Sequence, residues 1–391
     1  MANTTSTTNK GANRKILRLV TLDREETISS IPFTANAPAT LPTQGGIIPS
    51  NRFLYGLKLH FRGRVTNAAS GNPTAVLADA PWSIINLVDI QGYHRPRAKT
   101  EDFFNLRGPD IYQLNKNYSS SNPFVNYVVN GSSAAALSTA ASATNDFEFI
   151  LSIIFPPEKV GLMQQFGYLL DAPNYDSLVM NVYFADDKSL FSGQTTASTF
   201  SAFGSATGSP EVRVSGIFAQ GGSQAFQGFI PGRVWRYYKE NVSGDIVSGA
   251  TQSRQYNIPT GYQIRSILMK TGIKATTVSS GNNAYSSLTD SIFQNITVYR
   301  GTNNAVRLFR DYQTIKEASR QAYAILPDTG YALIDFCKHG ALFEMFDATQ
   351  LTAGPTGNVD FYLASDVAGA AGQASLFVCQ EVRGKPQGLA A

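Results

Sequence analysis

The chain has 391 residues, of which 43% are apolar and only 15% are charged, and its formal net charge at pH 7 is +4. This length exceeds that of a usual single domain, so two domains are expected, and the composition excludes an intrinsically disordered protein. The weak net charge argues against a nucleic-acid-binding protein, in which basic residues gather on one face. The 33 glycines, 24 phenylalanines and 18 tyrosines are typical of β-strands joined by turns.

The sequence contains no sign of a membrane span, a secretion signal or a redox centre. No apolar run approaches the roughly 18 residues that a spanning helix needs, and the amino terminus lacks the charged and then apolar plan of a signal peptide. Cys337 and Cys379 have no metal-binding or redox spacing. We expect buried free thiols, with one disulfide as the alternative.

The amino-terminal segment is small and polar at first and then becomes basic. Arg14, Lys15 and Arg18 stand among apolar residues in a pattern that fits a short helix and a strand almost equally well. One interpretation is a first strand with solvated arginines. The other is a basic arm, including Lys10, that contacts anionic lipid or nucleic acid.

The stretch over residues 80–118 organises the rest of the sequence. Its first part, up to Ile90, is mostly apolar, and Pro81 suits the first position of a strand buried on both faces. Its last part places Ile111, Leu114 and Tyr118 at helical spacing after Gly108-Pro109. The sequence therefore predicts a strand followed by a helix.

The same order returns in the second half of the chain. A strand-like run over residues 291–298 leads into residues 303–323, where apolar residues repeat at helical spacing. Three apolar pairs lie 208 residues apart, namely Ile84 and Ile292, Val88 and Ile296, and Ile90 and Val298. Residues 181–187 match residues 360–366 at the smaller separation of 179, which a loop over residues 119–145 in the first half alone would explain. The pattern indicates an internal repeat.

The remaining elements are expected from alternating apolar residues and from turn residues. The first half is predicted to hold strands over residues 27–33, 53–65, 147–155, 178–184 and 212–218, a helix over 158–170, and surface loops near 119–145 and 189–209. The second half is predicted to hold strands over residues 252–258, 262–274, 331–336, 341–345, 359–363 and 375–382.

This order of elements resembles the double jelly-roll major capsid proteins of tailless icosahedral viruses, which are tectivirus-like and often contain a membrane. The resemblance covers the chain from Arg14 onward, and the motifs that carry it are Ala80-Pro-Trp-Ser-Ile-Ile85 and Gly108-Pro-Asp-Ile-Tyr-Gln-Leu114. It implies an all-β chain of two tandem eight-stranded jelly rolls, each with a short helix after its fourth-strand region. The expected divisions are a flexible arm over residues 1–14, a first jelly roll over 15–221 and a second over 222–391.

The resemblance also implies a function. Such proteins are structural: homotrimers with six lobes tile an icosahedral shell around the genome, here that of a bacteriophage. The expected partners are further copies of the chain, penton proteins and minor capsid proteins. The arm, with Lys10, Arg14, Lys15 and Arg18, would lie inside the shell against membrane lipid or genome. The protein would reside in the virion, and in the host cytoplasm before assembly.

We find no signature of catalysis, a cofactor or a metal in the sequence. His60, His94 and His339 lack ligand spacing, and a solvated or structural role is the simpler interpretation. The basic run around His94 fits either a phosphate contact or a solvated loop. The acidic residues that follow strands fit turns better than a calcium site, and these are Asp186, Asp187 and Asp366.

An aromatic cluster with basic neighbours gives one more candidate surface. Trp235, Tyr237 and Tyr238 beside Arg233 and Arg236 fit either a first strand of the second lobe or a surface that stacks bases or sugars. The rival functions are a carbohydrate-binding or carbohydrate-cleaving β-sandwich protein and a viral spike or penton protein. A glycosidase needs two carboxylates across a cleft, about 5–10 Å apart, and the sequence offers no clear pair.

Overall fold

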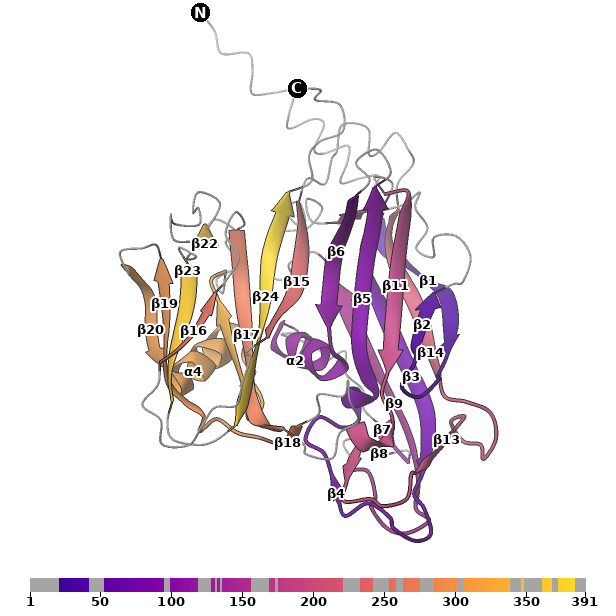
Figure 1. Ribbon diagram of the computed structural model, residues 1–391. Coiled ribbons are helices and arrows are strands. Elements are labelled where there is room, and N and C mark those ends of the chain that lie inside the picture. The colour runs from indigo at the N-terminus through magenta and orange to yellow at the C-terminus, as the bar shows by residue number, and fades with distance from the viewer. Residues whose placement is uncertain are drawn as a thin grey trace, which may run out of the picture.

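A computed structural model describes the chain over residues 21–41, 53–94, 99–118, 128–130, 132–133, 136–155, 169–172, 175–220, 233–241, 253–257, 263–274, 285–300, 305–337, 346–347, 361–367 and 372–383. These residues form two lobes of β-strands side by side, with helix α2 between them and helix α4 on the far flank of the second lobe (Figure 1). No helix in this part of the chain is long and apolar enough to cross a membrane.

The first lobe is built from residues before position 221. Its strands are β1 (Thr21–Pro32), β2 (Pro38–Leu41), β3 (Phe53–Thr66), β4 (Ala75–Val76), β5 (Ile85–His94), β6 (Lys99–Leu106), β7 (Val128–Val129), β8 (Ser132–Ser133), β9 (Thr144–Ile154), β10 (Leu170–Asp171), β11 (Ser177–Phe184), β12 (Phe191–Ser192), β13 (Thr199–Ser201) and β14 (Glu211–Gln220). The helices are η1 (Trp82–Ile84), α2 (Gly108–Tyr118) and η4 (Asp187–Ser189).

The second lobe repeats the plan with fewer short strands. Its strands are β15 (Arg233–Asn241), β16 (Ser253–Asn257), β17 (Gln263–Lys274), β18 (Tyr285–Leu288), β19 (Phe293–Arg300), β20 (Ala305–Asp311), β21 (Tyr331–Asp335), β22 (Phe346–Asp347), β23 (Phe361–Val367) and β24 (Gln373–Arg383), and its helix is α4 (Tyr312–Tyr323).

The two lobes share one strand order, which is that of a jelly roll. In the first lobe, β1-β14-β3-β9 form one sheet and β2-β11-β5-β6 form the facing sheet; in the second, the corresponding orders are β15-β24-β17-β21 and β16-β23-β19-β20. Counted along the chain, the first and eighth strands pair in each lobe, as do the fourth and fifth. The predicted all-β fold of two tandem jelly rolls is confirmed.

Alternating burial explains why the central strands form as they do. In β3, Leu57, Leu59 and Phe61 point into the core and are fully buried, while Lys58 and His60 lie between them on the outer face. The repeat pairs are all fully buried: Val88 and Ile90 on β5 match Ile296 and Val298 on β19, and Ile84 and Ile292 stand directly before these two strands. The sequence repeat therefore corresponds to equivalent core positions in the two lobes.

The helices follow the fifth main strand of each lobe, β6 or β20, and not the Ala80-type strand itself. The helix that we expected over residues 303–323 begins only at Tyr312, because residues 305–311 form β20. Both overlooked strands contain a register shift beside their partner, at Ile90/Gln91 for β6 and at Val298/Tyr299 for β20. Such a bulge breaks the alternation that would have marked a strand.

Other expected elements are shifted or fall outside the described residues. The helix expected over 158–170 lies outside them up to residue 168, and Leu170 belongs to β10. The strand expected over 341–345 also lies outside them, directly before β22. The two stretches expected as plain loops include short paired strands, which are β7 and β8 in the first and β12 and β13 in the second. The proposed boundary at residues 221 and 222 lies between β14 and β15, outside the described residues, and stays a prediction.

Candidate functional site: the contact between the lobes

Helix α2 belongs to the first lobe but is enclosed by both (Figure 1). Eight of its residues are buried, including Asp110, Gln113 and Asn117 at full burial. Gly108 begins the helix against η1, where an added Cβ would stand 2.1 Å from the Trp82 carbonyl oxygen. This close approach admits only glycine, and it joins the two motifs that carry the family resemblance.

A buried ion pair links the lobes at the start of α2. The Lys270 Nζ atom on β17 of the second lobe donates to Asp79 Oδ2 of the first at 2.7 Å, and it lies 3.8 Å from Asp110 Oδ1. The side chains of Lys270 and Asp79 are each only 2% exposed. Tyr331 on β21 donates its hydroxyl to Asp110 at 3.3 Å. The ammonium also lies over the Tyr285 ring, 4.6 Å from its centre.

The electrostatics of this cluster keep the lysine charged and the phenols neutral. Burial opposes the charge of Lys270, but Asp79 and Asp110 outweigh it, so the pKa of Lys270 lies above its ordinary value. Burial, together with the neighbouring Asp110 and Asp79 carboxylates, raises the pKa of Tyr331 well above its usual value. Burial also raises the pKa of Tyr285, although the nearby Lys270 charge opposes this rise. The arrangement joins the two lobes through buried charges and hydrogen bonds.

A second contact joins the lobes at the end of α2. Tyr118 donates its hydroxyl to Ser266 Oγ on β17 at 2.7 Å, and the Arg265 guanidinium lies 4.4 Å from the centre of its ring. The Tyr118 ring meets the edge of Tyr323 on α4, with centres 5.5 Å apart. Lys116 forms an ion pair with Asp328. The helix is therefore held to the second lobe along its whole length.

The two lobes also share hydrogen bonding between their sheets. Strand β6 of the first lobe pairs in parallel with β15 of the second at Phe104 and Tyr237, which joins eight strands in the order β18-β17-β24-β15-β6-β5-β11-β2 within one ten-stranded sheet. The backbone around Tyr237 is thus the first strand of the second lobe, as one of the two interpretations of the aromatic cluster expected.

Most of the predicted site residues have structural roles or lie outside the described residues. Lys10, Arg14, Lys15 and Arg18 lie outside them, as does His339, and of His94 and Asp366 only the backbone is described, in β5 and β23. His60 lies on the outer face of β3 with its Nε2 atom 3.3 Å from Glu148 Oε2.

The paired aspartates after β11 shape a turn. Asp186 accepts hydrogen bonds from Asn36 Nδ2 at 2.9 Å and from the Lys188 backbone at 3.1 Å, while Asp187 accepts one from the Ser198 backbone at 2.6 Å. Within the described ranges, no group of three potential ligand residues could hold a metal ion. Cys337 and Cys379 are free and buried, as expected.

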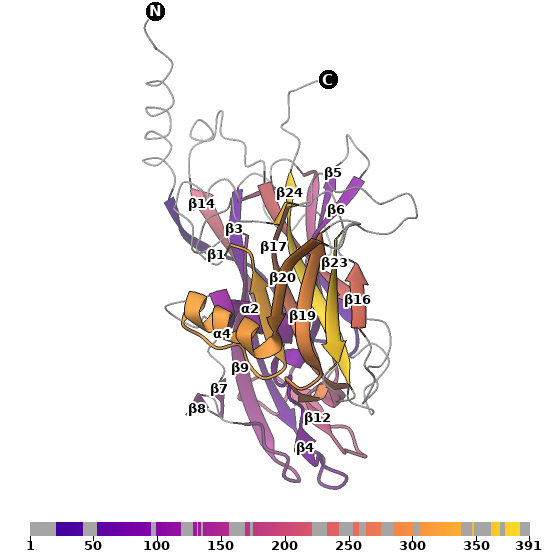
Figure 2. The same cartoon turned by 90° about the vertical axis from the view of Figure 1, so that its left-hand side faces the viewer.

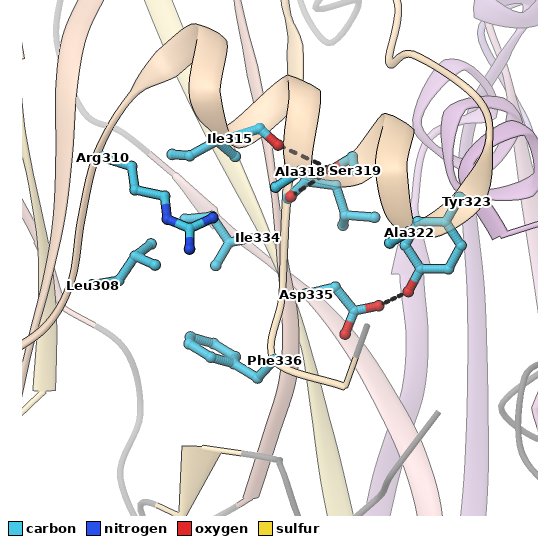
Figure 3. A pocket seen from close by; sticks show the side chains of 11 residues that line it. Leu308, Arg310, Ile315, Ala318, Ser319, Ala322, Tyr323, Ile334, Asp335 and Phe336 are labelled. Carbon is cyan, nitrogen blue, oxygen red and sulfur yellow. Dashed lines mark hydrogen bonds between the residues drawn. The ribbon is translucent and has the colours of Figure 1, made fainter. Parts of the chain in front are cut away.

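A pocket of about 230 Å³ opens on the outer flank of the second lobe, beneath α4 (Figure 3). Its walls come from α4, β20 and β21, and the Arg310 side chain extends into it. Asp335 at its edge accepts a hydrogen bond from Tyr323. Arg310 and Asp335 are the charged side chains of the lining, and aliphatic and aromatic residues make up most of the rest. The pocket is therefore a candidate contact surface.

Comparison with solved structures shows which fold this is. The chain is similar to the STIV major capsid protein, of Sulfolobus Turreted Icosahedral Virus, with 12% identity, a TM-score of 0.60, and coverage of 94% of this chain and 98% of that one. It is also similar to the major capsid protein P2 from bacteriophage PM2, with 11% identity, a TM-score of 0.53, and coverage of 93% and 98%. A third similar structure is PBCV-1 VP54, with 10% identity, a TM-score of 0.52, and coverage of 92% and 93%.

The chain has the double jelly-roll fold of viral major capsid proteins. No protein-family model and no curated protein matches the sequence. At this level of identity, the common feature is the arrangement of the strands and not the side chains.

Sequence reasoning missed the residues that join the double jelly roll. Lys270 and Asp79 are 191 positions apart, so no local spacing connects them. The available signal was a lysine directly after the apolar run Ile267-Leu-Met269, since a fully buried lysine requires a buried partner. The motif around Asp110 was recognised, but its partners Tyr331 and Lys270 were not.

Replacing Lys270 with methionine is expected to destabilise the protein by about 3–5 kcal/mol, because Asp79 would keep its charge without the ammonium that donates to it at 2.7 Å, and Asp110 would lose a cation 3.8 Å away. Urea unfolding followed by circular dichroism measures the loss. The matched control is R213M, at an ion pair whose arginine side chain is 50% exposed, where a change within about 0.5 kcal/mol is expected. The double variant K270M/D79N should lose less than the two single losses combined, and strict additivity would contradict the ion pair.

The buried cluster also predicts a loss of stability in alkali. Above about pH 10 the unfolded chain releases phenol and ammonium protons that the folded chain retains on Tyr331, Tyr285 and Lys270, since their folded pKa values are raised. The free energy of unfolding should therefore be insensitive to these groups from pH 7 to 9 and fall beyond pH 10. Urea midpoints measured up to pH 11.5 test this. Y331F should reduce the slope by about one proton, or 1.4 kcal/mol per pH unit, and an unchanged slope would contradict the assignment.

Proposed function

We propose that this protein is a major capsid protein, and that three copies form a capsomer with six lobes that tiles an icosahedral shell. The observation that carries the proposal is the pair of lobes with one strand order, fastened by a buried contact. Three such pairs around a threefold axis present six similar lobes. The similarity in fold to viral capsid proteins over more than nine-tenths of the chain supports this function.

The chemistry of the surface agrees with a structural role. A shell protein needs rigid lobes and large complementary flanks, and stable obligate contacts bury on the order of 2,000 Å² or more. The buried ion pair of Lys270 and Asp79 holds the two lobes rigidly together, because such a pair has one favourable geometry. The candidate carboxylates after β11 are engaged in turn hydrogen bonds and are not placed across a cleft.

The expected partners follow from this role. Copies of the same chain would contact one another within and between capsomers, and penton and minor capsid proteins would fill the remaining positions. The amino-terminal arm, with Lys10, Arg14, Lys15 and Arg18, would face inward toward membrane lipid or genome. The protein would accumulate in the host cytoplasm before assembly and then reside in the virion.

The purified protein should have a solution mass of three times the chain mass of 42.3 kDa. Sedimentation equilibrium at neutral pH measures this mass, and negative-stain images of the same sample should show particles with a six-lobed outline. A stable monomer under every condition would contradict the proposal. An elongated trimer or a pentamer would instead identify a spike or penton protein, and micromolar binding to a glycan array would favour the carbohydrate-binding rival.

Removing residues 2–20, which precede β1, should leave trimers intact and reduce particle formation, because the arm is proposed to act inside the shell. A charge-reversed variant, R14E/K15E/R18E, should reproduce the loss if the arm acts through its basic residues. The control R14K/R18K keeps the charges and should assemble normally. Sedimentation of assembled particles from expressing cells measures the yield, and a normal yield from the truncated chain would reject the role of the arm.

A further inference from the structure

Each flank of the chain has an edge strand that is equivalent to one of the two strands joined at the contact between the lobes. In the first lobe, β6 ends its four-stranded sheet and pairs with β15, which begins the sheet of the second lobe. Strand β20 holds the place of β6 in the second lobe, and β1 holds the place of β15 in the first. Both end their sheets, and neither has a second strand partner among the described residues.

The two helices show the same difference. Asn115 of α2 hydrogen-bonds the Ser152 backbone on β9, and Ser319 of α4 hydrogen-bonds the Leu333 carbonyl on β21. The helices begin at Gly108 and Tyr312, 204 positions apart, which is also the separation of Phe104 and Leu308 on the preceding strands, so position 115 is equivalent to position 319. While α2 is enclosed by both lobes, α4 lies on the open flank of the second lobe (Figure 2). One face of α4 is buried, and Gln313, Thr314, Arg320 and Gln321 on its other faces are exposed.

The equivalence places the pocket beneath α4 at the site of a contact. Tyr118 of α2 is 6% exposed and contacts Ser266 and Arg265 of the second lobe, and Leu114, one turn before it, is 7% exposed. Their equivalents on α4 are Ala322 and Ala318, which line the pocket. Small residues thus stand where α2 has large ones, and they leave room for an incoming surface.

Strand β20, which adjoins α4, differs from its equivalent β6 in the same way: its residues are less buried. Phe104 and Leu106 on β6 are 3% and 0% exposed, and their equivalents Leu308 and Arg310 on β20 line the pocket and are half-buried. The equivalence follows from pairing, since Phe104 pairs with Ile90 and Leu308 pairs with Val298, the repeat of Ile90. Among the described residues no carboxylate forms an ion pair with Arg310, which is therefore available to an incoming acidic group (Figure 3).

We propose that the β20 edge and the pocket beneath α4 receive the first lobe of a second copy of this chain. Its β1 edge would continue the β20 sheet in parallel, and the outer face of its β3–β9 sheet would cover α4. This contact repeats, between chains, the contact that β15 and β17 make with β6 and α2 within one chain. The inference rests on the proposed trimer and names the surfaces that close it.

Charge on the two surfaces supports this occupant. The outer face of β3 and β9 carries Glu148, whose side chain is 30% exposed and is shared by His60 and Arg62. The opposite surface carries Arg310, which forms no ion pair with any carboxylate that the structure describes, together with the Glu317–Arg320 pair on α4. Each surface therefore offers partners of both signs to the other. One heterologous contact repeated around a threefold axis closes into a ring and leaves no free edge.

The contact predicts which backbones meet. Tyr237 pairs with Phe104 within the chain, and the equivalent positions are Thr27 on β1 and Leu308 on β20. Position 27 is assigned by following the strand pairing in each lobe. In the first lobe Thr27 pairs with Ser215, which pairs with Lys58. In the second lobe Tyr237 pairs with Cys379, which pairs with Ser266, and positions 58 and 266 have the repeat separation of 208. Cysteines at positions 27 and 308 of adjacent copies should therefore form a disulfide.

The experiment oxidises the full-length double variant T27C/L308C and separates it on non-reducing gels. We expect covalent dimers and closed trimers, whereas the single variants and the control pair T27C/A206C, with a cysteine on an exposed loop, should stay monomeric on the gel. Trimers by sedimentation that never cross-link at these positions would overturn the inference and leave the proposed function intact. A protein that never forms trimers would overturn both.

A second variant tests the pocket without touching the strand edge. A318K adds a cation beside Arg310 on a helix surface that tolerates lysine, so the monomer should keep its unfolding midpoint. The dissociation constant of the trimer should rise at least about tenfold, because the new charge would be buried without a partner. The same substitution in the loop, A206K, should change neither quantity. Normal trimers from a folded A318K protein would overturn the inference.

Discussion

The buried pair of Lys270 and Asp79 sets the conditions under which the rest of the molecule works. An ammonium and a carboxylate that are each 2% exposed lose most of their hydration, and only close and well-oriented contact offsets that loss. The two lobes must therefore meet in one arrangement, with α2 at a fixed depth between them. Small rotations that a purely apolar contact would tolerate would separate the charges. Rigidity of the lobe pair is thus a consequence of burying charge, and a lattice that repeats one contact many times depends on such rigidity.

The double jelly roll follows from sequence wherever alternation is clean. Strand β3 alternates inward and outward residues from Leu57 onward, and the pairs of residues 208 positions apart on and directly before β5 and β19 are buried in the core. Strands β6 and β20 escaped detection because a register shift places neighbouring residues such as Phe103 and Phe104 in the core together. Val306 and Phe309 of β20 stand at helical spacing from Tyr312 of α4 in the sequence. The apolar pattern therefore predicted one continuous helix where the structure has a strand followed by a helix.

The candidate site was much less accessible to sequence reasoning than the fold. Its contacts join residues from opposite halves of the chain, such as Tyr118 with Ser266 and Asp110 with Tyr331, and no periodicity within a strand encodes such a pairing. The two motifs around Trp82 and Asp110 were recognised as distinctive, and Gly108 shows why they occur together: its backbone packs against the Trp82 carbonyl. The partners were missing because a buried lysine in β17 reads as a solvated residue until the second lobe is placed against it.

In the proposed trimer, the contact between the lobes of one chain and the contact between two chains differ in polarity because they form at different times. The contact inside the chain forms once, during folding, between lobes that are already tethered, so it loses little further freedom of motion. It has no need to remain soluble alone, and charges are fully buried in it. A surface that waits for another molecule must stay hydrated until assembly. The exposed polar residues of α4 and the paired charges on the outer face of β3 fit that requirement. In the proposed trimer the same geometry is used twice with different chemistry, which accounts for two lobes that share their strand order and have such different helices.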